Sequence, residues 1–178
     1  MRTLVLSTVL VGTLIAQTQA QDAEAEKKAI AKIRESGALV LEIAQNDNRL
    51  DVSYITAQGK ITAEQLAPLK DLARLAHLNL RGLEIGDDAV AHIAGQKTLV
   101  RLHLEKTKIT DKALEHLKGL ENLEYLNVYG TEIGDAGLEH LTNLKKLKSL
   151  YVWQTKVTDE GVKKLQEALP NLKIVRGT

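Results

Sequence analysis

The sequence predicts an α/β solenoid built from short parallel strands and short helices that stack as repeated turns. Apolar residues recur with a period of 24 residues over residues 75–165. Within each period the apolar spacing changes from every second residue to every third or fourth, as expected where a strand gives way to a helix. Aromatic residues make up only 3% of the chain and Phe is absent, so aliphatic side chains must fill the core.

Several columns of residues carry this period, each member 24 positions after the last. The strand columns are Leu78, Leu102, Leu126, Leu150 and Leu80, Leu104, Val128, Val152. The helix columns include Asp87, Asp111, Asp135, Asp159 and Val90, Leu114, Leu138, Val162. A fainter unit with Ile61, Leu66 and Leu69 precedes them. Since one unit cannot bury its apolar face alone, we expect about five turns to share one core.

Each unit begins with a predicted strand and continues with a predicted helix. In one unit, Leu126 and Val128 share one face of the strand, because side chains alternate between the two faces. Leu138, Leu141 and Leu144 then recur at the spacing of a short helix with one buried stripe.

These motifs allow a comparison with a known family. The pattern Leu-x-x-Leu-x-Leu-x-x-Thr-x-Ile-Thr-Asp, which starts at Leu99, resembles the cysteine-containing subclass of leucine-rich repeats. Threonine replaces that cysteine in three units: Thr107, Thr131 and Thr155. Residues 123–176 are similar to the short exported leucine-rich repeat proteins of planctomycetes and related bacteria.

The resemblance implies a right-handed horseshoe with parallel strands on the concave face and short helices on the convex face. It also implies a binding role rather than a reaction. The threonine hydroxyls are expected to bond the backbone of the adjacent turn. Some relatives carry cytochrome-like domains, but no Cys-x-x-Cys-His occurs here, so no haem and no other cofactor is expected.

The first residues have the organisation of a secretory signal peptide, predicted over residues 1–20. A positive start at Arg2 is followed by an apolar run and by small residues that end at Ala20. This run is shorter than the roughly 20 apolar residues that a membrane span needs. We therefore expect cleavage and a secreted or periplasmic protein that does not span the membrane.

Residues 21–49 are predicted to form a capping helix and a hairpin strand, and residues 50–178 the repeat domain with a last strand at its end. Asp22 is suited to begin the helix, and Gly37 is suited to end it. Alternating apolar residues predict the hairpin, which surrounds a polar tetrapeptide at residues 45–48. They are Leu39, Leu41, Ile43 and Leu50, Val52, Tyr54. An open stack needs such a cap at each end.

Composition excludes several classes of site. Without cysteine, the chain cannot form disulfides, thiolate metal sites or a cysteine nucleophile. Its formal net charge of +1 gives no electrostatic reason to expect a nucleic acid partner.

Candidate binding residues are the strand positions that face away from the core. Three columns hold them: His77, Arg101, Tyr125, Ser149; Asn79, His103, Asn127, Tyr151; and Arg81, Glu105, Tyr129, Trp153. Four rings, Tyr125, Tyr129, Tyr151 and Trp153, therefore fall on two adjacent strands. Such rings dominate interface energies, although they also suit strands and pack on each other. Both interpretations, a partner site and simple packing, remain open at this stage.

Arg81 and Glu105 are lateral neighbours in these columns and are expected to form an exposed ion pair. His103 lies on the same strand face as Glu105, which suggests acid–base chemistry. Because no nucleophile or metal-ligand set accompanies them, catalysis is the less favoured interpretation.

Two further columns invite a metal hypothesis. His92, His116 and His140 recur in phase, but adjacent helices pack about 8–10 Å apart, too far to share one ion. The aspartates at 87, 111, 135 and 159 supply one carboxylate per turn, whereas Ca²⁺ needs six to eight converging oxygens. We interpret the aspartates, with the threonines that precede two of them, as helix caps, and expect no metal.

The sequence thus predicts a noncatalytic exported module that binds a protein or peptide on its strand face. The binding residues are expected to be Tyr125, Tyr129, Tyr151, Trp153, Arg101, His103, Glu105 and Asn127. Glycan binding in the cell envelope is one alternative, since sugars also stack on Tyr and Trp. A purely structural envelope protein is a second alternative, and a hydrolase-like enzyme is a third.

Overall fold

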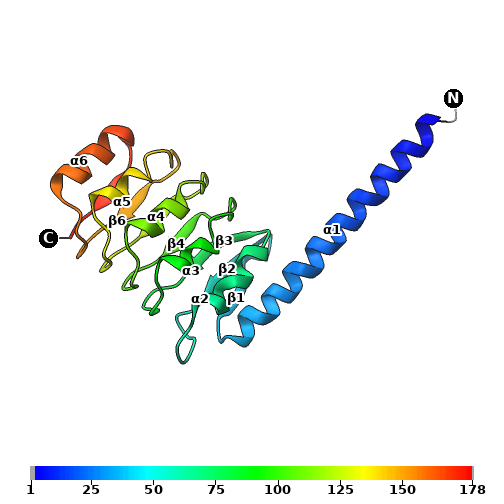
Figure 1. The fold of residues 1–178 in the computed structure, drawn as a ribbon, viewed down its shortest axis with the longest axis horizontal. Helices are drawn as coiled ribbons and strands as arrows, with labels where there is room; N and C mark the ends of the chain where they lie inside the picture. The colour runs from blue at the N-terminus through cyan, green and yellow to red at the C-terminus, as the bar shows by residue number, and fades with distance from the viewer. Residues whose placement is uncertain (1–2, 178) are drawn as a thin grey trace.

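Seven strands form one open sheet and lie in chain order from β1 to β7 (Figure 1). The structure is a computed structural model that describes residues 3–177. The strands are β1 (Leu39–Ala44), β2 (Asp47–Ser53), β3 (Leu75–Asn79), β4 (Arg101–His103), β5 (Tyr125–Asn127), β6 (Ser149–Tyr151) and β7 (Lys173–Val175). β1 and β2 pair as an antiparallel hairpin, and every later neighbour pairs in parallel.

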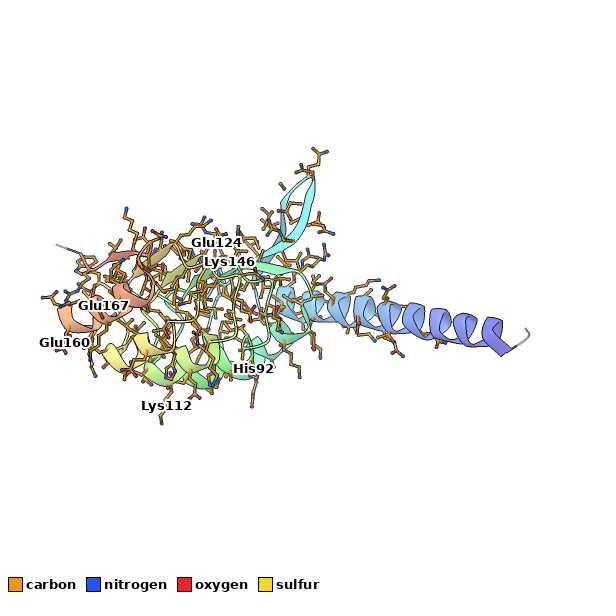
Figure 2. All side chains as sticks on the ribbon, turned by 90° about the horizontal axis from the view of Figure 1, so that it is seen from above. His92, Lys112, Glu124, Lys146, Glu160 and Glu167 are labelled. Atoms are coloured by element: carbon orange, nitrogen blue, oxygen red, sulfur yellow. The ribbon has the colours of Figure 1, made fainter. Side chains whose placement is uncertain are left out.

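Short helices return the chain from each strand to the next along the other side of the sheet. They are α2 (Ala63–Leu66), η1 (Ala67–Asp71), α3 (Asp87–Ala91), α4 (Asp111–Leu117), α5 (Asp135–Glu139) and α6 (Asp159–Ala168). In Figure 2, His92 and Lys112 project from this helical side, and Glu124 and Lys146 lie on the opposite side of the stack. The predicted solenoid of alternating strands and helices is therefore confirmed.

The core lies between the sheet and the helices and is almost wholly aliphatic. Leu102, Leu126 and Leu150, one from each of three neighbouring strands, are fully buried. Among the described residues, Tyr54 is the one aromatic side chain in this core. Gln96, which interrupts a leucine column, is buried and donates a hydrogen bond to the carbonyl of Leu69 at 2.6 Å.

Three threonines, one in each of three units, bond the backbone within their own unit. The hydroxyls of Thr107, Thr131 and Thr155 donate to the carbonyls of Leu104, Val128 and Val152 at 2.7, 2.6 and 2.6 Å. Each of these carbonyls lies three residues earlier in the same unit. The hydroxyl thus closes the tight turn that follows each strand.

The first helix, α1 (Thr3–Glu35), is much longer than the predicted cap and projects away from the stack (Figure 1). Asp22 lies inside this helix rather than at its start, which corrects the expected boundary. The last turns cap the solenoid as expected, with Ala29 and Ile33 buried against the first turn. The helix ends before Gly37, whose φ of +87° is a conformation that suits glycine.

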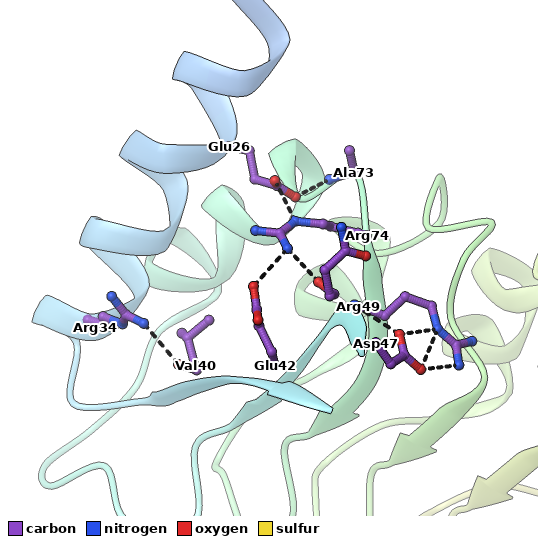
Figure 3. Close-up of polar contacts among 9 residues, drawn as sticks. Glu26, Arg34, Val40, Glu42, Asp47, Arg49, Ala73 and Arg74 are labelled. Carbon is purple, nitrogen blue, oxygen red and sulfur yellow. Dashed lines mark hydrogen bonds and ion pairs between the residues drawn. The ribbon is translucent and has the colours of Figure 1, made fainter. Parts of the chain in front are cut away.

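Arg74 fixes α1 and the hairpin to the first parallel strand (Figure 3). Its guanidinium lies 2.9 Å from Glu26 of α1 and 3.2 Å from Glu42 of β1. Glu26 also accepts a hydrogen bond from the amide of Ala73 at 2.9 Å. In the described part of the chain, no helix is both long enough and apolar enough to cross a membrane.

The hairpin forms as predicted, and the face of β1 that it buries carries Val40. In β1 the buried residue is Val40, which pairs with the buried Val52 of β2. Leu39 and Leu41 point to the other side and are 49% and 60% exposed. The buried face is set by the register with β2, because a strand's neighbour decides which of its two faces meets the core.

Candidate functional site

Two rows of side chains cross the sheet on the side away from the helices, and we call this surface the strand face. The strand pairing places Leu41, Asp51, His77, Arg101, Tyr125, Ser149 and Lys173 in one row. It places Leu39, Ser53, Asn79, His103, Asn127, Tyr151 and Val175 in the other. The first two predicted columns are thus correct, and they extend onto the hairpin.

The four predicted rings lie together and form two contacting pairs across β5 and β6. The ring centroids of Tyr125 and Tyr151 are 5.3 Å apart, with a tilt of 42°. Tyr129 and Trp153 are stacked at 5.0 Å with 15° between their planes. These separations lie in the range at which aromatic pairs attract each other. Trp153 is nevertheless 45% exposed, so the ring cluster keeps a face open to a partner.

Two cationic side chains border the ring cluster. The guanidinium carbon of Arg101 lies 4.8 Å from the centroid of Tyr125. The ammonium nitrogen of Lys106 lies 5.5 Å from the centroid of Tyr129. Both distances permit a cation–π attraction, which orients the two cations along the strand face.

Glu105 is buried and does not pair with Arg81, which corrects the expected surface ion pair. Its Oε1 atom lies 2.8 Å from Nδ1 of His103 and accepts a hydrogen bond from the amide of Asn127 at 2.7 Å. His103 lies at the end of β4, two residues before Glu105, and Asn127 lies on the neighbouring strand β5. The other oxygen, Oε2, is buried without a hydrogen-bond partner among the described residues.

Asn127 holds the backbone that carries Tyr129. Its Oδ1 atom accepts a hydrogen bond from the amide of Tyr129 at 3.0 Å, and its Nδ2 atom donates to Glu105. Asn79 makes the equivalent bond to the amide of Arg81 at 3.1 Å. Both ends of the Asn127 side-chain amide are therefore hydrogen-bonded within the protein, and this side chain positions Tyr129.

The phenol of Tyr125 is protonated at neutral pH. Partial burial raises its pKa above the ordinary value, and the hydrogen bond with Asn127 opposes that shift only in part. The hydroxyl therefore remains available as a hydrogen-bond donor on the strand face.

The columns considered for metal binding have other roles in the structure. The carboxylates of Asp87 and Asp135 accept hydrogen bonds from Thr110 and Thr158 of the following turn. His92 and His140 are the C-cap residues of α3 and α5. In the described residues, no three His, Cys, Asp or Glu side chains come together as a metal site requires.

Sequence reasoning missed the hairpin part of the strand face. Alternation identified Leu39 and Leu41 as strand residues that share a face, without saying which face meets the core. Their register opposite Ser53 and Asp51 places them in the same rows as Tyr151 and Tyr125. Ile55, two residues after Ser53, is 57% exposed and continues this apolar surface. The strand pairing was the missing information.

Comparison with known proteins finds one repeat of the chain in a described family. Residues 119–141 match the family model described as Leucine Rich repeat. One repeat of the chain therefore matches this family, and the whole chain has the leucine-rich repeat fold. Proteins with this fold generally serve as protein-interaction modules and are typically noncatalytic. A search of curated proteins gave no match to the sequence.

One solved structure shows the same fold, and a second is reported beside it. The leucine-rich repeat ectodomain of the receptor kinase SOBIR1 from Arabidopsis thaliana matches with a TM-score of 0.55 and 18% identity. That match covers 86% of this chain and 91% of the ectodomain. A leucine-rich repeat protein of Leptospira interrogans matches with a TM-score of 0.44 and 18% identity, over 61% of this chain and 33% of that protein.

Proposed function

We propose that this leucine-rich repeat protein is an exported, noncatalytic module that binds a protein or peptide on its strand face. The observation that carries the proposal is the ring cluster of Tyr125, Tyr129, Tyr151 and Trp153. Tyr125 and Tyr151 contact each other on β5 and β6, Tyr129 and Trp153 stack two residues after the ends of these strands, and Trp153 is almost half exposed. Aromatic residues of this kind, with Arg beside them, are the residues that most often dominate binding energies.

The strand face also suits binding because its side chains are held in place before a partner arrives. Asn127 fixes the backbone at Tyr129, and Glu105 fixes Asn127 and His103. A preorganised surface loses little side-chain freedom on association, so more of the contact energy appears as affinity. This preorganisation supports a binding role for the strand face.

Export is supported by the order of residues 1–20, which have the positive start, apolar run and small residues of a signal peptide. The similarity to exported planctomycete proteins supports the same location. A cut after Ala20 removes part of α1 and leaves Ala29 and Ile33, the residues that cap the core. The mature protein therefore retains its N-terminal cap.

The experiment is a selection of random peptides displayed on phage against the purified, folded protein. Peptides of about 12 residues are long enough to cross the whole sheet at about 3.3 Å per residue. We expect enriched peptides that bind the wild type and lose affinity at least tenfold, about 1.4 kcal/mol, for the Tyr129→Ala/Trp153→Ala variant. Circular dichroism and thermal unfolding establish that the variant is folded.

Lys112→Gln is the matched control, because Lys112 lies on the helical side (Figure 2). It should leave the selected peptides bound as tightly as before. If the selected peptides bind the Tyr129→Ala/Trp153→Ala variant as tightly as the wild type, the ring cluster is not the binding site. A glycan array probed with the same proteins separates the alternatives: ring-dependent binding to a polysaccharide, with no peptide selected, would replace the proposed partner by a glycan.

A further inference from the structure

We infer that the partner is an extended acidic peptide segment that crosses the strands, with an aliphatic residue seated on the capping hairpin. This inference rests on the proposed function and specifies its ligand. The binding surface then has three parts: an apolar end at Leu39, Leu41 and Ile55, a cationic middle at Arg81, Arg101 and Lys106, and the ring cluster.

The exposed apolar side chains support the two ends of this surface. Where the structure describes side chains, the large hydrophobic residues that are exposed are Leu39, Leu41, Ile55 and Trp153. The strand register puts Leu39 and Leu41 in the rows that lead to Tyr151 and Tyr125. Exposed apolar residues are therefore concentrated on the proposed binding surface, at opposite ends of it, rather than scattered over the molecule.

The charges between these ends are mainly positive. Arg81, Arg101 and Lys106 are exposed, and none of them belongs to an ion pair among the described residues. The carboxylates in the same rows are already engaged: Asp51 lies 3.2 Å from His77, and Glu105 is buried beside His103. The strand face therefore offers unpaired cations and complements a partner that carries carboxylates.

The backbone at Lys106 adds an independent observation. Lys106 has a φ of +56°, a conformation that costs a non-glycine residue about 1 kcal/mol or more. The equivalent positions one turn before and one turn after are Gly82 and Gly130, which also have positive φ. Glycine would serve the fold at 106, whereas lysine adds an ammonium group over the ring of Tyr129. Gln154, the next member of this column after Gly130, also has a positive φ, of +53°. The ammonium group over Tyr129, rather than the backbone conformation, is therefore what distinguishes Lys106.

The spacing sets the length of the ligand. The apolar residues of β1 lie five strands from the rings of β6. At about 4.8 Å per strand, that distance is about 24 Å, which an extended peptide spans with about seven residues. The inferred motif therefore has an aliphatic residue at one end, Asp or Glu near its middle, and a group that packs on Tyr or Trp at the other end.

The test repeats the phage selection with variants that change one part of the surface at a time. The wild type should enrich peptides with the inferred motif. The variant Leu39→Ser/Leu41→Ser should still select acidic peptides but should lose the preference for an aliphatic residue. Its affinity for peptides selected on the wild-type protein should be about fivefold to tenfold weaker. The variant Arg101→Gln/Lys106→Gly should no longer select acidic peptides. For peptides selected on the wild-type protein, affinity for the wild type should decrease with added salt, whereas affinity for this variant should not. Lys106→Gly alone removes the charge and keeps the backbone conformation, so its effect on binding is separable from folding.

The outcomes distinguish this inference from the proposed function. If the selected peptides depend on the ring cluster but are neutral or basic, the inference of an acidic ligand is overturned and the proposed function remains. Unchanged selection by the Leu39/Leu41 variant removes the hairpin from the binding surface. If no peptide is selected, both proposals are overturned. If a single-stranded oligonucleotide binds instead, and this binding depends on the ring cluster, the cations of the strand face would be binding phosphate groups.

Discussion

Asp135 accepts hydrogen bonds from both the amide and the hydroxyl of Thr158, at 2.8 and 2.7 Å, and so connects one turn of the solenoid to the next. Asp87 makes the same pair of bonds to Thr110, and Asp111 accepts one from the amide of Gly134. Asp159, at the last turn, instead pairs with Arg176. The aspartate column thus links successive turns, whereas the threonines cap the helices themselves.

Replacing Asp135 by Ala should destabilise the protein by about 1–2 kcal/mol, because the amide and hydroxyl of Thr158 lose their acceptor. Urea unfolding followed by circular dichroism measures this difference. Asp135→Asn keeps one acceptor oxygen and should cost less. Equal stability of the alanine variant and the wild type would show that the link between turns contributes nothing.

Stability should decrease in acid partly through Asp135. The hydrogen bonds from Thr158 lower the pKa of its carboxyl below the ordinary value of 3.8. Since the folded pKa is below the unfolded one, this contribution is present above the unfolded pKa and is lost as pH falls through the folded pKa. Between about pH 5 and pH 2, the free energy of unfolding of Asp135→Asn should therefore decrease less steeply than that of the wild type. Parallel curves would contradict this assignment.

Gly161→Ala should destabilise the protein although alanine is the better helix former by about 1 kcal/mol. A Cβ atom at 161 would lie 2.0 Å from Oδ1 of Asp135, so the aspartate must move and release Thr158. We expect a net loss of about 1–3 kcal/mol in chemical denaturation. Gly95→Ala is the matched control, since nothing lies within 4 Å of its added Cβ. In an Asp135→Ala background the effect of Gly161→Ala should largely disappear; persistence there would point to a different clash.

Glu105→Ala should reduce both stability and binding by the strand face. It leaves His103 and the amide of Asn127 without their shared acceptor, and we expect a loss of about 1–3 kcal/mol. Glu105→Gln keeps an acceptor oxygen and should preserve most of the stability and the position of Tyr129. Thermal unfolding and peptide affinity of both variants test this. A glutamine variant as damaged as the alanine variant would show that the charge, rather than the acceptor, is what matters.

The full chain expressed in a bacterium with a secretory pathway should be recovered outside the cytoplasm with Gln21 as its first residue. Mass spectrometry of the intact protein identifies the first residue from the molecular mass. Ala20→Arg removes the small residue before the predicted cut and should prevent cleavage. Recovery of an exported protein that still begins at Met1 would contradict the predicted signal peptide.

Much of the fold was predictable because each turn obeys the same local rules. The column of Leu78, Leu102, Leu126 and Leu150 identified the parallel strands and even their register, since equal spacing places equal residues side by side. The same reasoning brought the four rings of the site together. It failed for Glu105, because a column assigns a side chain to a face without saying how much its neighbours cover.

The sequence by itself determined the repeat, the aliphatic core and the grouping of Tyr125, Tyr129, Tyr151 and Trp153, all of which follow from periodicity and side-chain alternation. Only the tertiary structure decided that Val40 faces the core while Leu39 and Leu41 join the strand face, and that Asp135 holds the following turn. The physical reason is that alternation fixes which residues share a face of a strand, whereas burial and pairing depend on the neighbour that packs against that face.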